Sequence, residues 1–432
     1  MTASSTPAAD SSSPSSLGAL RQVPYMGVIQ VLAEAGKVGW SMGDSSWSNL
    51  GQGQPDPGEM EGAPERIKTV ELDPGDHAYG PLEGLPELRQ SIADDYNRRY
   101  RQGKKPYGPQ HVAIASGGRL ALTRIMAALD AVAVGYQLPD YTAYEDMFNI
   151  HLGRIRPVPV ACSEERGFRL DLDSLRTAIR EEQLEAFLLS NPTNPTGVSL
   201  RGEELDQLVA LARDPGTTLI LDEFYSHFIY DLDADGVATP GAGPVSGAAY
   251  VEDPDRDPVL IVDGLTKNHR YPGWRVGWVL GPQAMVEAIA RTASSIDGGP
   301  SRPSQRAACE ALQPARADAE TNAVREVFCA KRNRMIEVLS SLGVRFAATP
   351  DSTFYCWGNV SALPAPWNTS QGFFRAALEQ RVITVPGEAF DVNPGGVRTG
   401  PAAYGEWLRF SFGPDMENME AGLQRLVAGI TS

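Results

Sequence analysis

The chain has 432 residues, of which 42% are hydrophobic and 21% are charged, so it is long enough for two domains or for one large domain with a smaller one. Its formal net charge of −16 argues against nucleic acid or an anionic membrane surface as the main partner. No apolar run approaches the roughly 18 residues of a membrane-spanning helix, so we expect no membrane partner.

Residues 1–17 are rich in Ser, Thr, Ala and Pro and contain neither a basic start nor an apolar stretch. This composition predicts a disordered tail rather than a signal peptide. The four cysteines are scattered without the spacing of a metal site or a redox motif, which predicts reduced thiols and no bound metal. The cytoplasm is therefore the expected location.

Between residues 111 and 280, short apolar segments alternate with helical stretches. This alternation predicts an α/β fold, with βαβ units around a mostly parallel central sheet flanked by helices. The expected strands occupy residues 111–115, 131–135, 155–161, 186–190, 217–221 and 259–262, and the expected helices occupy residues 120–129, 170–183 and 202–212.

The rest of the pattern predicts a second, smaller layer. Residues 232–258, rich in Gly, Ala, Pro and Asp, predict a long loop or insertion near the site. A long helix over residues 317–342 is expected to lead into a smaller α/β domain, with strands at residues 354–357 and 407–412.

Lys267 is the most informative candidate residue. It follows the apolar strand at residues 259–262, and open α/β sheets bind ligands beyond the carboxyl ends of their strands. Arg275, eight residues later, offers a planar fork that suits a phosphate group. An amine that can form a Schiff base, with a phosphate clamp nearby, points to pyridoxal phosphate as cofactor. A surface Lys and Arg on a loop is the alternative.

Two turns after other predicted strands carry further candidates. Gly117 and Gly118 end one strand and open a helix, so their backbone amides can reach an anion, although a Gly-Gly pair can also be an ordinary turn. Asn194, in the string Asn191-Pro-Thr-Asn-Pro-Thr-Gly197, can donate to a phenolic oxygen, and the alternative there is an Asn-Pro turn.

An acid and several tyrosines complete this edge of the sheet. Asp222 follows a buried strand and needs a partner, and a pyridinium N–H would serve as one, as would the start of a helix. Tyr225 could reach the other polar edge of the same ring. Tyr141 or Tyr144, past a further strand, could stack on a cofactor ring or pack in the core.

Arg409 lies in the middle of a predicted strand between apolar residues. A buried guanidinium needs an anion, and the α-carboxylate of a substrate is one candidate. A structural ion pair is the other.

Taken together, these residues and their spacings resemble the fold-type I pyridoxal-phosphate enzymes of the aminotransferase class I/II family. The resemblance covers about residues 45–425. It implies a division into an N-terminal arm with part of the small domain (18–60), a large cofactor-binding domain (61–315) and a small C-terminal domain (316–432). It also implies a homodimer with shared active sites.

The resemblance further implies a role for each matching residue. Lys267 would form the Schiff base and carry protons, and Asp222 would pair with the pyridine nitrogen. Arg409 would bind the substrate carboxylate. The other implied contacts are Asn194 and Tyr225 to the phenolic oxygen, Tyr141 on the ring face, Gly117, Gly118, Arg119, Thr266 and Arg275 to the phosphate, Tyr79 to the partner subunit's phosphate, and Gly53 over the substrate.

Two departures from the family pattern stand out. The family often has Ser-x-Ser-Lys, whereas this chain has Gly264-Leu-Thr-Lys267, so one phosphate-binding hydroxyl is absent. A bulky polar set, Asn268-His269-Arg270-Tyr271, follows the lysine. Two histidines, His77 and His269, lie nearest to the inferred site, and the pattern assigns neither a role.

The expected activity is that of a pyridoxal-phosphate enzyme acting at the α-carbon of an amino acid, by default an aminotransferase. The stretch Pro272-Gly273-Trp274-Arg275 also resembles 1-aminocyclopropane-1-carboxylate synthase. The alternative is therefore a lyase, cyclase or γ-replacement enzyme acting on S-adenosylmethionine or a guanidino amino acid. A non-catalytic regulator with the same fold is a third hypothesis, and the presence of Lys267, Asp222 and Arg409 argues against it.

Overall fold

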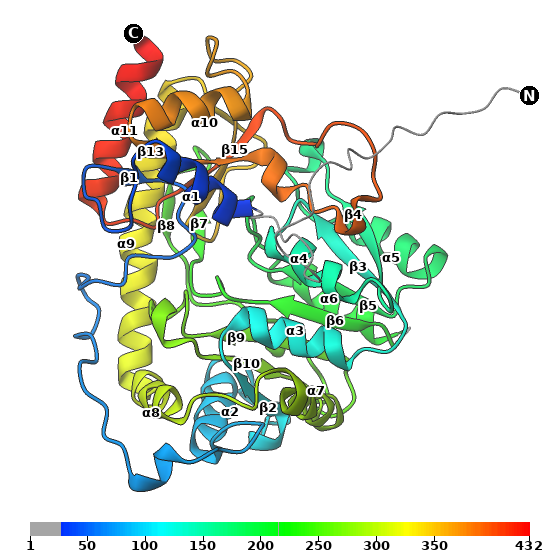
Figure 1. Cartoon of the computed structure of the whole chain (residues 1–432). Helices are drawn as coiled ribbons and strands as arrows, with labels where there is room; N and C mark the ends of the chain where they lie inside the picture. Colours follow the sequence, from blue (N-terminus) through cyan, green and yellow to red (C-terminus); the bar gives the residue numbers. More distant parts are fainter. Residues whose placement is uncertain (1–26, 215) are drawn as a thin grey trace, which may run out of the picture.

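The computed structural model describes residues 27–214 and 216–432, so the predicted tail at residues 1–17 lies outside the described residues. At its centre is a seven-stranded sheet in the order β2-β10-β9-β6-β5-β3-β4 (Figure 1). Only β10 runs antiparallel to its neighbours β2 and β9. The strands are β2 (Val112–Ala115), β3 (Ala133–Leu138), β4 (Arg156–Ala161), β5 (Ala186–Ser190), β6 (Thr218–Asp222), β9 (Val259–Gly264) and β10 (Gly277–Leu280).

Helices cover both faces of this sheet because its strands are apolar on both sides. In β5, Ala186 and Leu188 belong to one core, whereas Phe187 and Leu189 belong to the other. Successive strand residues point to opposite faces, so a continuous apolar run requires a layer of helices on each side. The helices of this part are α2 (Pro86–Tyr100), α3 (Gly118–Ala128), α4 (Ala143–His151), α5 (Leu172–Glu181), α6 (Glu203–Arg213), α7 (Gln283–Ile296) and α8 (Arg302–Ala311).

A second sheet lies in the C-terminal part, with antiparallel strands in the order β11-β12-β15-β14. The long helix α9 (Pro314–Ser341) runs along one side of the molecule towards this sheet (Figure 1). The remaining elements of this part are β11 (Arg345–Phe346), β12 (Tyr355–Asn359), α10 (Ser370–Glu379), β13 (Val382–Ile383), β14 (Val385–Pro386), β15 (Trp407–Ser411) and α11 (Met416–Thr431).

The N-terminal segment joins this C-terminal part. Helix α1 (Gly27–Lys37) lies beside it, and the short strand β1 (Ser48–Asn49) pairs in parallel with β13 (Figure 1). Residues after β1 then continue towards the larger sheet. The first described elements, α1 and β1, are thus packed against β13, β14 and α11 of the C-terminal part.

The expected α/β class with a mostly parallel sheet is confirmed, and most predicted elements agree within a residue or two. The strand predicted at 131–135 is displaced, because β3 begins at Ala133 and continues through the buried polar residue Gln137. Residues 232–258, predicted as a long loop or insertion, contain a regular element. Strands β7 (Tyr230–Leu232) and β8 (Ala238–Pro240) form a hairpin there, whose turn is held by Asp233 Oδ1 accepting from the amides of Asp235 and Val237.

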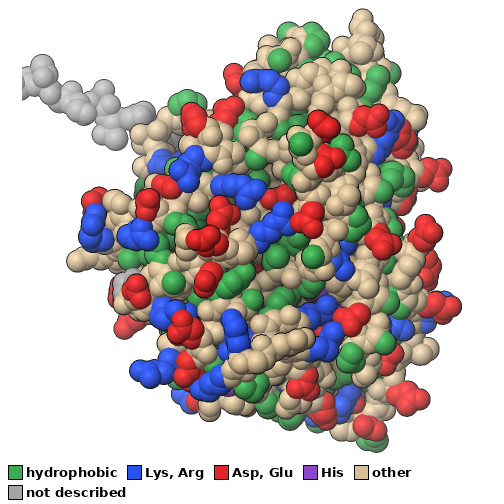
Figure 2. Space-filling model, turned by 180° about the vertical axis from the view of Figure 1, so that it is seen from behind, with side chains coloured by type: hydrophobic (Ala, Val, Ile, Leu, Met, Phe, Trp, Pro, Cys, Tyr) green, Lys and Arg blue, Asp and Glu red, His purple; other side chains and the backbone are tan. Residues whose placement is uncertain are grey.

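Figure 2 shows the reverse face, where acidic and basic side chains are interspersed between small apolar areas. Many of the charged groups are paired, as in Arg334 with Glu420 at 2.6 Å. No helix within residues 27–214 and 216–432 is long and apolar enough to cross a membrane.

Candidate active site

A cavity of about 790 Å³ opens beyond the carboxyl ends of β5, β6 and β9. The segment that follows β1 and strands β12 and β15 of the smaller sheet complete its wall. Eleven of the thirteen predicted site residues line it: Gly53, Gly118, Arg119, Tyr141, Asn194, Asp222, Tyr225, Thr266, Lys267, Arg275 and Arg409. Gly117 and Tyr79 do not.

Lys267 lies in the loop after β9 and is partly buried, with its Nζ donating to the carbonyl oxygen of Gly53. Burial and the nearby guanidinium groups of Arg409, Arg275 and Arg119 lower the pKa of this amine to about 7. A large fraction of the lysine is then neutral near pH 7, and a neutral amine can act as nucleophile or base.

Asp222, the last residue of β6, is buried beside the cavity. Its Oδ2 accepts from the hydroxyl of Tyr144 at 2.8 Å, whereas Oδ1 has no hydrogen-bond partner among the described residues. Burial raises the pKa of Asp222 to about 6, against the opposing effect of the Tyr144 hydrogen bond. The free oxygen makes this carboxylate ready to accept from a ligand N–H group.

The two tyrosines considered for stacking have different surroundings. Tyr141 lines the cavity, and its hydroxyl accepts from Nε of Arg119 at 3.0 Å. Tyr144 is fully buried in α4, and its hydroxyl is engaged by Asp222. Tyr144 therefore supports the carboxylate from behind, and only Tyr141 remains as a stacking candidate.

A second group of side chains surrounds Arg409. Its Nη1 donates to Oδ1 of Asn194 at 2.9 Å and its Nη2 to the carbonyl of Gly51 at 2.8 Å. Its guanidinium also lies 4.1 Å from the ring centre of Tyr355. The hydroxyl of Tyr225 is 3.1 Å from that of Tyr355 and 3.5 Å from Nδ2 of Asn194.

Sequence reasoning missed Tyr355 as a site residue, because it was placed only within an expected strand. The signal that could have found it is its position in that strand. Tyr355 and Trp357 alternate with Cys356 along β12, and Trp357 pairs with Arg409 in the neighbouring strand. Alternation puts Tyr355 and Trp357 on one face of the sheet. A polar hydroxyl near a buried arginine is then expected.

The start of α3 forms an anion cradle. Gly117, its N-cap, has a φ of +92°, and a side chain there would overlap the guanidinium of Arg275. A side chain at Gly118 would overlap the ring of Phe224. The Oγ1 of Thr266, nearby in sequence to Arg275, is buried without a partner among the described residues. The amide of Gly117 bonds the carbonyl of Ala115, so it is the amides after it that face outwards at this helix N-terminus. Such amides with an arginine beside them favour a phosphate group.

The remaining three candidates lie away from this cavity. Tyr79 is 95% exposed, and His77 is exposed as well. His269 is buried, with its ring edge-on to His227 at 5.4 Å. Burial and two nearby arginines lower the pKa of His269 to about 3. Neither histidine lines the cavity.

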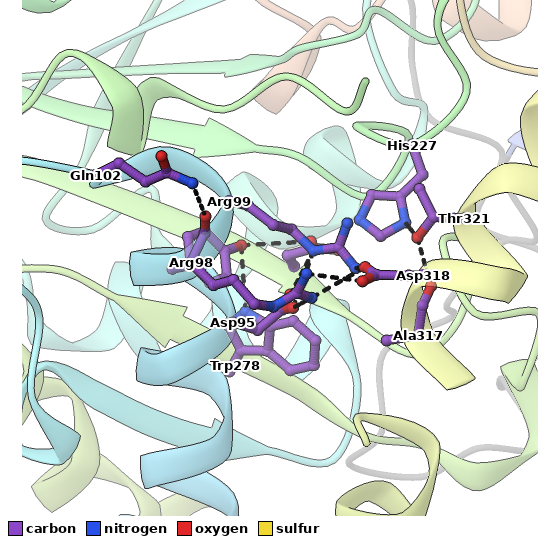
Figure 3. A network of polar contacts seen from close by, with 11 residues as sticks. Asp95, Arg98, Arg99, Gln102, His227, Trp278, Ala317, Asp318 and Thr321 are labelled. Atoms are coloured by element: carbon purple, nitrogen blue, oxygen red, sulfur yellow. Dashed lines mark hydrogen bonds and ion pairs between the residues drawn. The ribbon is translucent and has the colours of Figure 1, made fainter. Parts of the chain in front are cut away.

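A polar network links α2, α9 and the segment around His227 (Figure 3). The ring of His227, two residues after Tyr225, contacts the Thr321 hydroxyl on α9 at 3.1 Å. In the same view Arg98 and Arg99 of α2 bond Asp318 of α9. The loop that carries Tyr225 is thereby tied to α9.

The residues present fit pyridoxal phosphate. An unpartnered carboxylate oxygen suits a pyridine N–H, an anion cradle suits a phosphate, and an amine of lowered pKa suits an aldehyde. No group of three or more His, Cys, Asp or Glu within the described part of the chain is arranged to hold a metal ion.

Comparisons with known proteins agree with this chemistry. The family model for aminotransferase class I and II matches residues 45–426. The chain is 30% identical over 361 residues to the aspartate/prephenate aminotransferase of Cereibacter sphaeroides, covering 80% of this chain and 84% of that protein. It is 29% identical over 366 residues to the aspartate aminotransferase of Streptomyces avermitilis, covering 82% of each.

Among solved structures, the aromatic aminotransferase from Pyrococcus horikoshii superimposes with a TM-score of 0.72 at 26% identity, covering 91% of this chain and 97% of that one. A single mutant of Thermus thermophilus aspartate aminotransferase gives a TM-score of 0.75 at 25% identity, covering 94% of this chain and 97% of that one. With a family match across nearly the whole described chain, this protein belongs to the aminotransferase class I and II family, whose enzymes depend on pyridoxal phosphate.

Proposed function

We propose that the protein moves the α-amino group of an amino acid to a 2-oxo acid, with Lys267, Asp222 and Arg409 as its principal residues. The observation that carries this proposal is the cavity that all three side chains line, with an amine of lowered pKa, an acid with an unpartnered oxygen and a guanidinium fork. Each group suits a different part of the reaction: the proton transfer, the cofactor ring and the substrate carboxylate.

When bound, pyridoxal phosphate supplies an aldehyde for the substrate's amino group and a ring that withdraws electrons from the α-carbon. Asp222 would keep the ring nitrogen protonated through its unpartnered Oδ1. Asn194 and Tyr225 would donate to the phenolic oxygen, and Tyr141 would stack on the ring. The phosphate would meet Gly117, Gly118, Arg119, Thr266 and Arg275.

Lys267 would remove the proton from the substrate's α-carbon and return it to the neighbouring carbon of the cofactor. A base works best when its pKa lies near the working pH, and the pKa of Lys267, lowered to about 7, meets that condition. Its Nζ now bonds the carbonyl of Gly53, so this contact must be exchanged for substrate during the reaction.

Arg409 would hold the substrate's α-carboxylate by a bidentate pair. Its Nε has no partner among the described residues, and its two other nitrogens contact only the Asn194 side chain and the Gly51 carbonyl. A buried guanidinium that has no carboxylate partner among the described residues is suited to a substrate anion.

Aspartate is the first amino donor to test, because two relatives are named aspartate aminotransferase and aspartate/prephenate aminotransferase. The side chain of Arg119 lines the cavity, and among the described residues its hydrogen-bond partner is Tyr141, so it could meet a second carboxylate while the backbone amide of Arg119 faces the phosphate. A second candidate is a bulky apolar amino acid. The apolar part of the cavity lining favours it, since this part includes Val28, Leu32, Trp40, Met42 and Trp47.

The experiment is a panel assay. Purified enzyme loaded with pyridoxal phosphate is incubated with ¹⁵N-labelled amino acids and 2-oxoglutarate, or with S-adenosylmethionine alone. Mass spectrometry that finds ¹⁵N-glutamate and the matching 2-oxo acid supports amino transfer. A released side-chain fragment without labelled glutamate would instead support the elimination, cyclisation or replacement chemistry that the Pro272–Arg275 stretch suggested.

We further propose a homodimer with Tyr79 reaching the partner's phosphate. Tyr79 is 95% exposed, and the nearby apolar residues Val70 and Leu72 are 37% and 41% exposed, as a contact surface would be. Mixing Lys267→Ala and Tyr79→Phe subunits should give hybrids whose activity departs from the average of the parents. A fully active monomer by light scattering would refute the shared site.

The expected division into an arm (18–60), a large domain (61–315) and a small domain (316–432) is part of this proposal. Its support is the pairing of β1 with β13, which joins the N-terminal segment to the C-terminal sheet. The cytoplasm remains the proposed location, and all four cysteines are free thiols, as that compartment requires.

A further inference from the structure

We propose that Arg270 is a positioning residue that holds residues 53–58 over the active-site cavity while Lys267 reacts. The inference rests on the proposed function, in which Lys267 and Gly53 face the substrate. It assigns a role to part of the bulky polar set that follows the lysine and that the family resemblance left unexplained.

Arg270 links the catalytic loop to that segment. Its side chain is fully buried, and its Nη1 donates to the carbonyl oxygens of Asp56 and Gly58, each at 2.8 Å. Its backbone amide bonds the carbonyl of Lys267 at 3.1 Å and so closes a tight turn. A single residue thus connects the lysine's turn with the segment that forms the cavity wall.

The backbone conformation shows that the side chain is what this position needs. Arg270 has a φ of +55°, a left-handed conformation that residues with a Cβ rarely adopt. A glycine would adopt the same turn without strain. The contacts of the guanidinium offset that strain, so the arginine cannot be explained by the shape of the turn alone.

A buried ion pair fixes the guanidinium in place. Nε of Arg270 lies 2.6 Å from Oε1 of Glu320 on α9, and both side chains are almost fully buried. Arg66 adds a second cation, 3.4 Å from the same carboxylate, and donates to the carbonyl of Arg270 at 2.7 Å. The guanidinium of Arg270 is therefore fixed to the long helix α9 and not to a loop.

Three cationic side chains bond carbonyls of residues 51–58, and these bonds differ in how they relate to the chemistry. Arg409 bonds Gly51, Lys267 bonds Gly53, and Arg270 bonds Asp56 and Gly58. Lys267 must leave its carbonyl when its amine reacts, and Arg409 must turn to the substrate's carboxylate. Arg270 touches no reacting atom, so its two bonds can persist throughout the cycle and keep the wall in place.

The test compares Arg270→Lys with Arg124→Lys in the enzyme loaded with pyridoxal phosphate. Arg124 is a matched control, because it is equally buried, pairs with Asp297 at 2.6 Å, donates to the carbonyl of Ile114 at 2.8 Å, and lies outside the cavity wall. Lysine keeps the charge at both positions and removes the fork. Hydrogen–deuterium exchange of the peptide spanning residues 50–60 and steady-state kinetics with L-aspartate are then measured.

We expect Arg270→Lys to speed exchange of this peptide by about tenfold and to raise KM for L-aspartate by about tenfold, with kcat changed much less. The absorption spectrum of the bound cofactor should not change. Arg124→Lys should lower the unfolding temperature but leave the peptide's exchange and KM at the wild-type values. Exchange and KM equal to wild type in Arg270→Lys, or equal increases in the control, would overturn the proposal.

Arg270→Gly covers the case in which the lysine variant does not fold, because glycine relieves the strained backbone. It should show the same faster exchange and raised KM, and wild-type values would overturn the proposal. Exchange also separates the two hypotheses. If no amino acid of the panel transfers its amino group, the proposed function fails, and the exchange of residues 50–60 still decides whether Arg270 holds the wall.

Discussion

Two buried acids at the end of β6 have opposite surroundings although they are neighbours in sequence. Asp222 faces the cavity and leaves one oxygen free for a ligand. Glu223 does not line the cavity: its Oε1 accepts from the amide of Gly247 at 2.7 Å, and its Oε2, also without a partner among the described residues, has no cavity to face. Burial raises the pKa of both, to about 6 for Asp222 and about 8 for Glu223.

The same division recurs one strand away. Lys267 faces the cavity, whereas Asn268 lies behind the sheet, bonded to Ser226 at 3.0 Å and Asp263 at 2.9 Å, and its Oδ1 accepts from the amide of His227. A perturbed pKa therefore does not by itself identify a functional group in this protein. The deciding property is an unpartnered atom that faces a cavity, and the polar layer behind the sheet serves to hold the cavity residues still.

Among the variants that separate the cavity residues from those behind the sheet, Lys267→Ala should have the largest effect. It should lower amino transfer by at least about 10⁴-fold and abolish the visible absorption of the lysine-linked cofactor, while the unfolding temperature stays near wild type. Asn268→Ala should instead lower the unfolding temperature clearly, because it leaves buried polar groups without partners. Normal turnover in Lys267→Ala would remove this lysine from the mechanism.

Asp222→Ala should slow turnover by about 10³-fold, or about 4 kcal/mol of barrier, because the ring nitrogen would lose its anionic partner. Steady-state rates and circular dichroism check the rate and the fold together. A fall in turnover of less than about tenfold would show that another residue keeps the ring nitrogen protonated. Asp222 would then have no larger role in catalysis than Glu223.

Arg409→Lys tests the substrate end of the cavity. The variant keeps the charge and loses the bidentate fork, so KM for amino acids should rise by about ten- to a hundredfold. Amines that lack a carboxylate should be poor substrates of the wild type and should be little affected by the change. Equal reactivity of amino acids and their decarboxylated analogues would reassign Arg409 to a structural role.

Glu223→Gln should have the smallest effect on activity, within about twofold, because this side chain does not reach the cavity. Its effect lies in stability. The pKa of Glu223 is raised in the folded state from its ordinary 4.5 to about 8, so the folded state favours the protonated acid. The stability of the wild type should therefore be greatest below pH 4.5 with respect to this group and fall as the pH rises to about 8.

A glutamine mimics the protonated acid at every pH. The unfolding temperature of Glu223→Gln should therefore match the wild type near pH 4.5 and exceed it increasingly towards pH 8. Parallel pH profiles for the two proteins would show that Glu223 does not titrate as its surroundings require.

Much of this site could be predicted from the sequence because strand ends are local signals. The apolar runs before Asp222 and Lys267 fix both residues at one edge of a parallel sheet, and the order of strands does not change that conclusion. The contacts of Tyr144 and Arg270 could not be predicted, since each depends on a partner from a distant part of the chain. The antiparallel strand β10 was not predicted for a similar reason. Its pairing with β2 and β9 cannot be recognised from its own four residues.

The contact between Gly51 and Arg409 spans 358 positions of the chain. Strand β1 likewise pairs with β13, which is synthesised much later. All strands of the large sheet, with Lys267 and Asp222, are therefore synthesised before β13 and Arg409, which complete the cavity. The nascent chain can hold a folded sheet but no closed site. The site for the cofactor is therefore completed only when β1 and the segment after it meet β13 and β15.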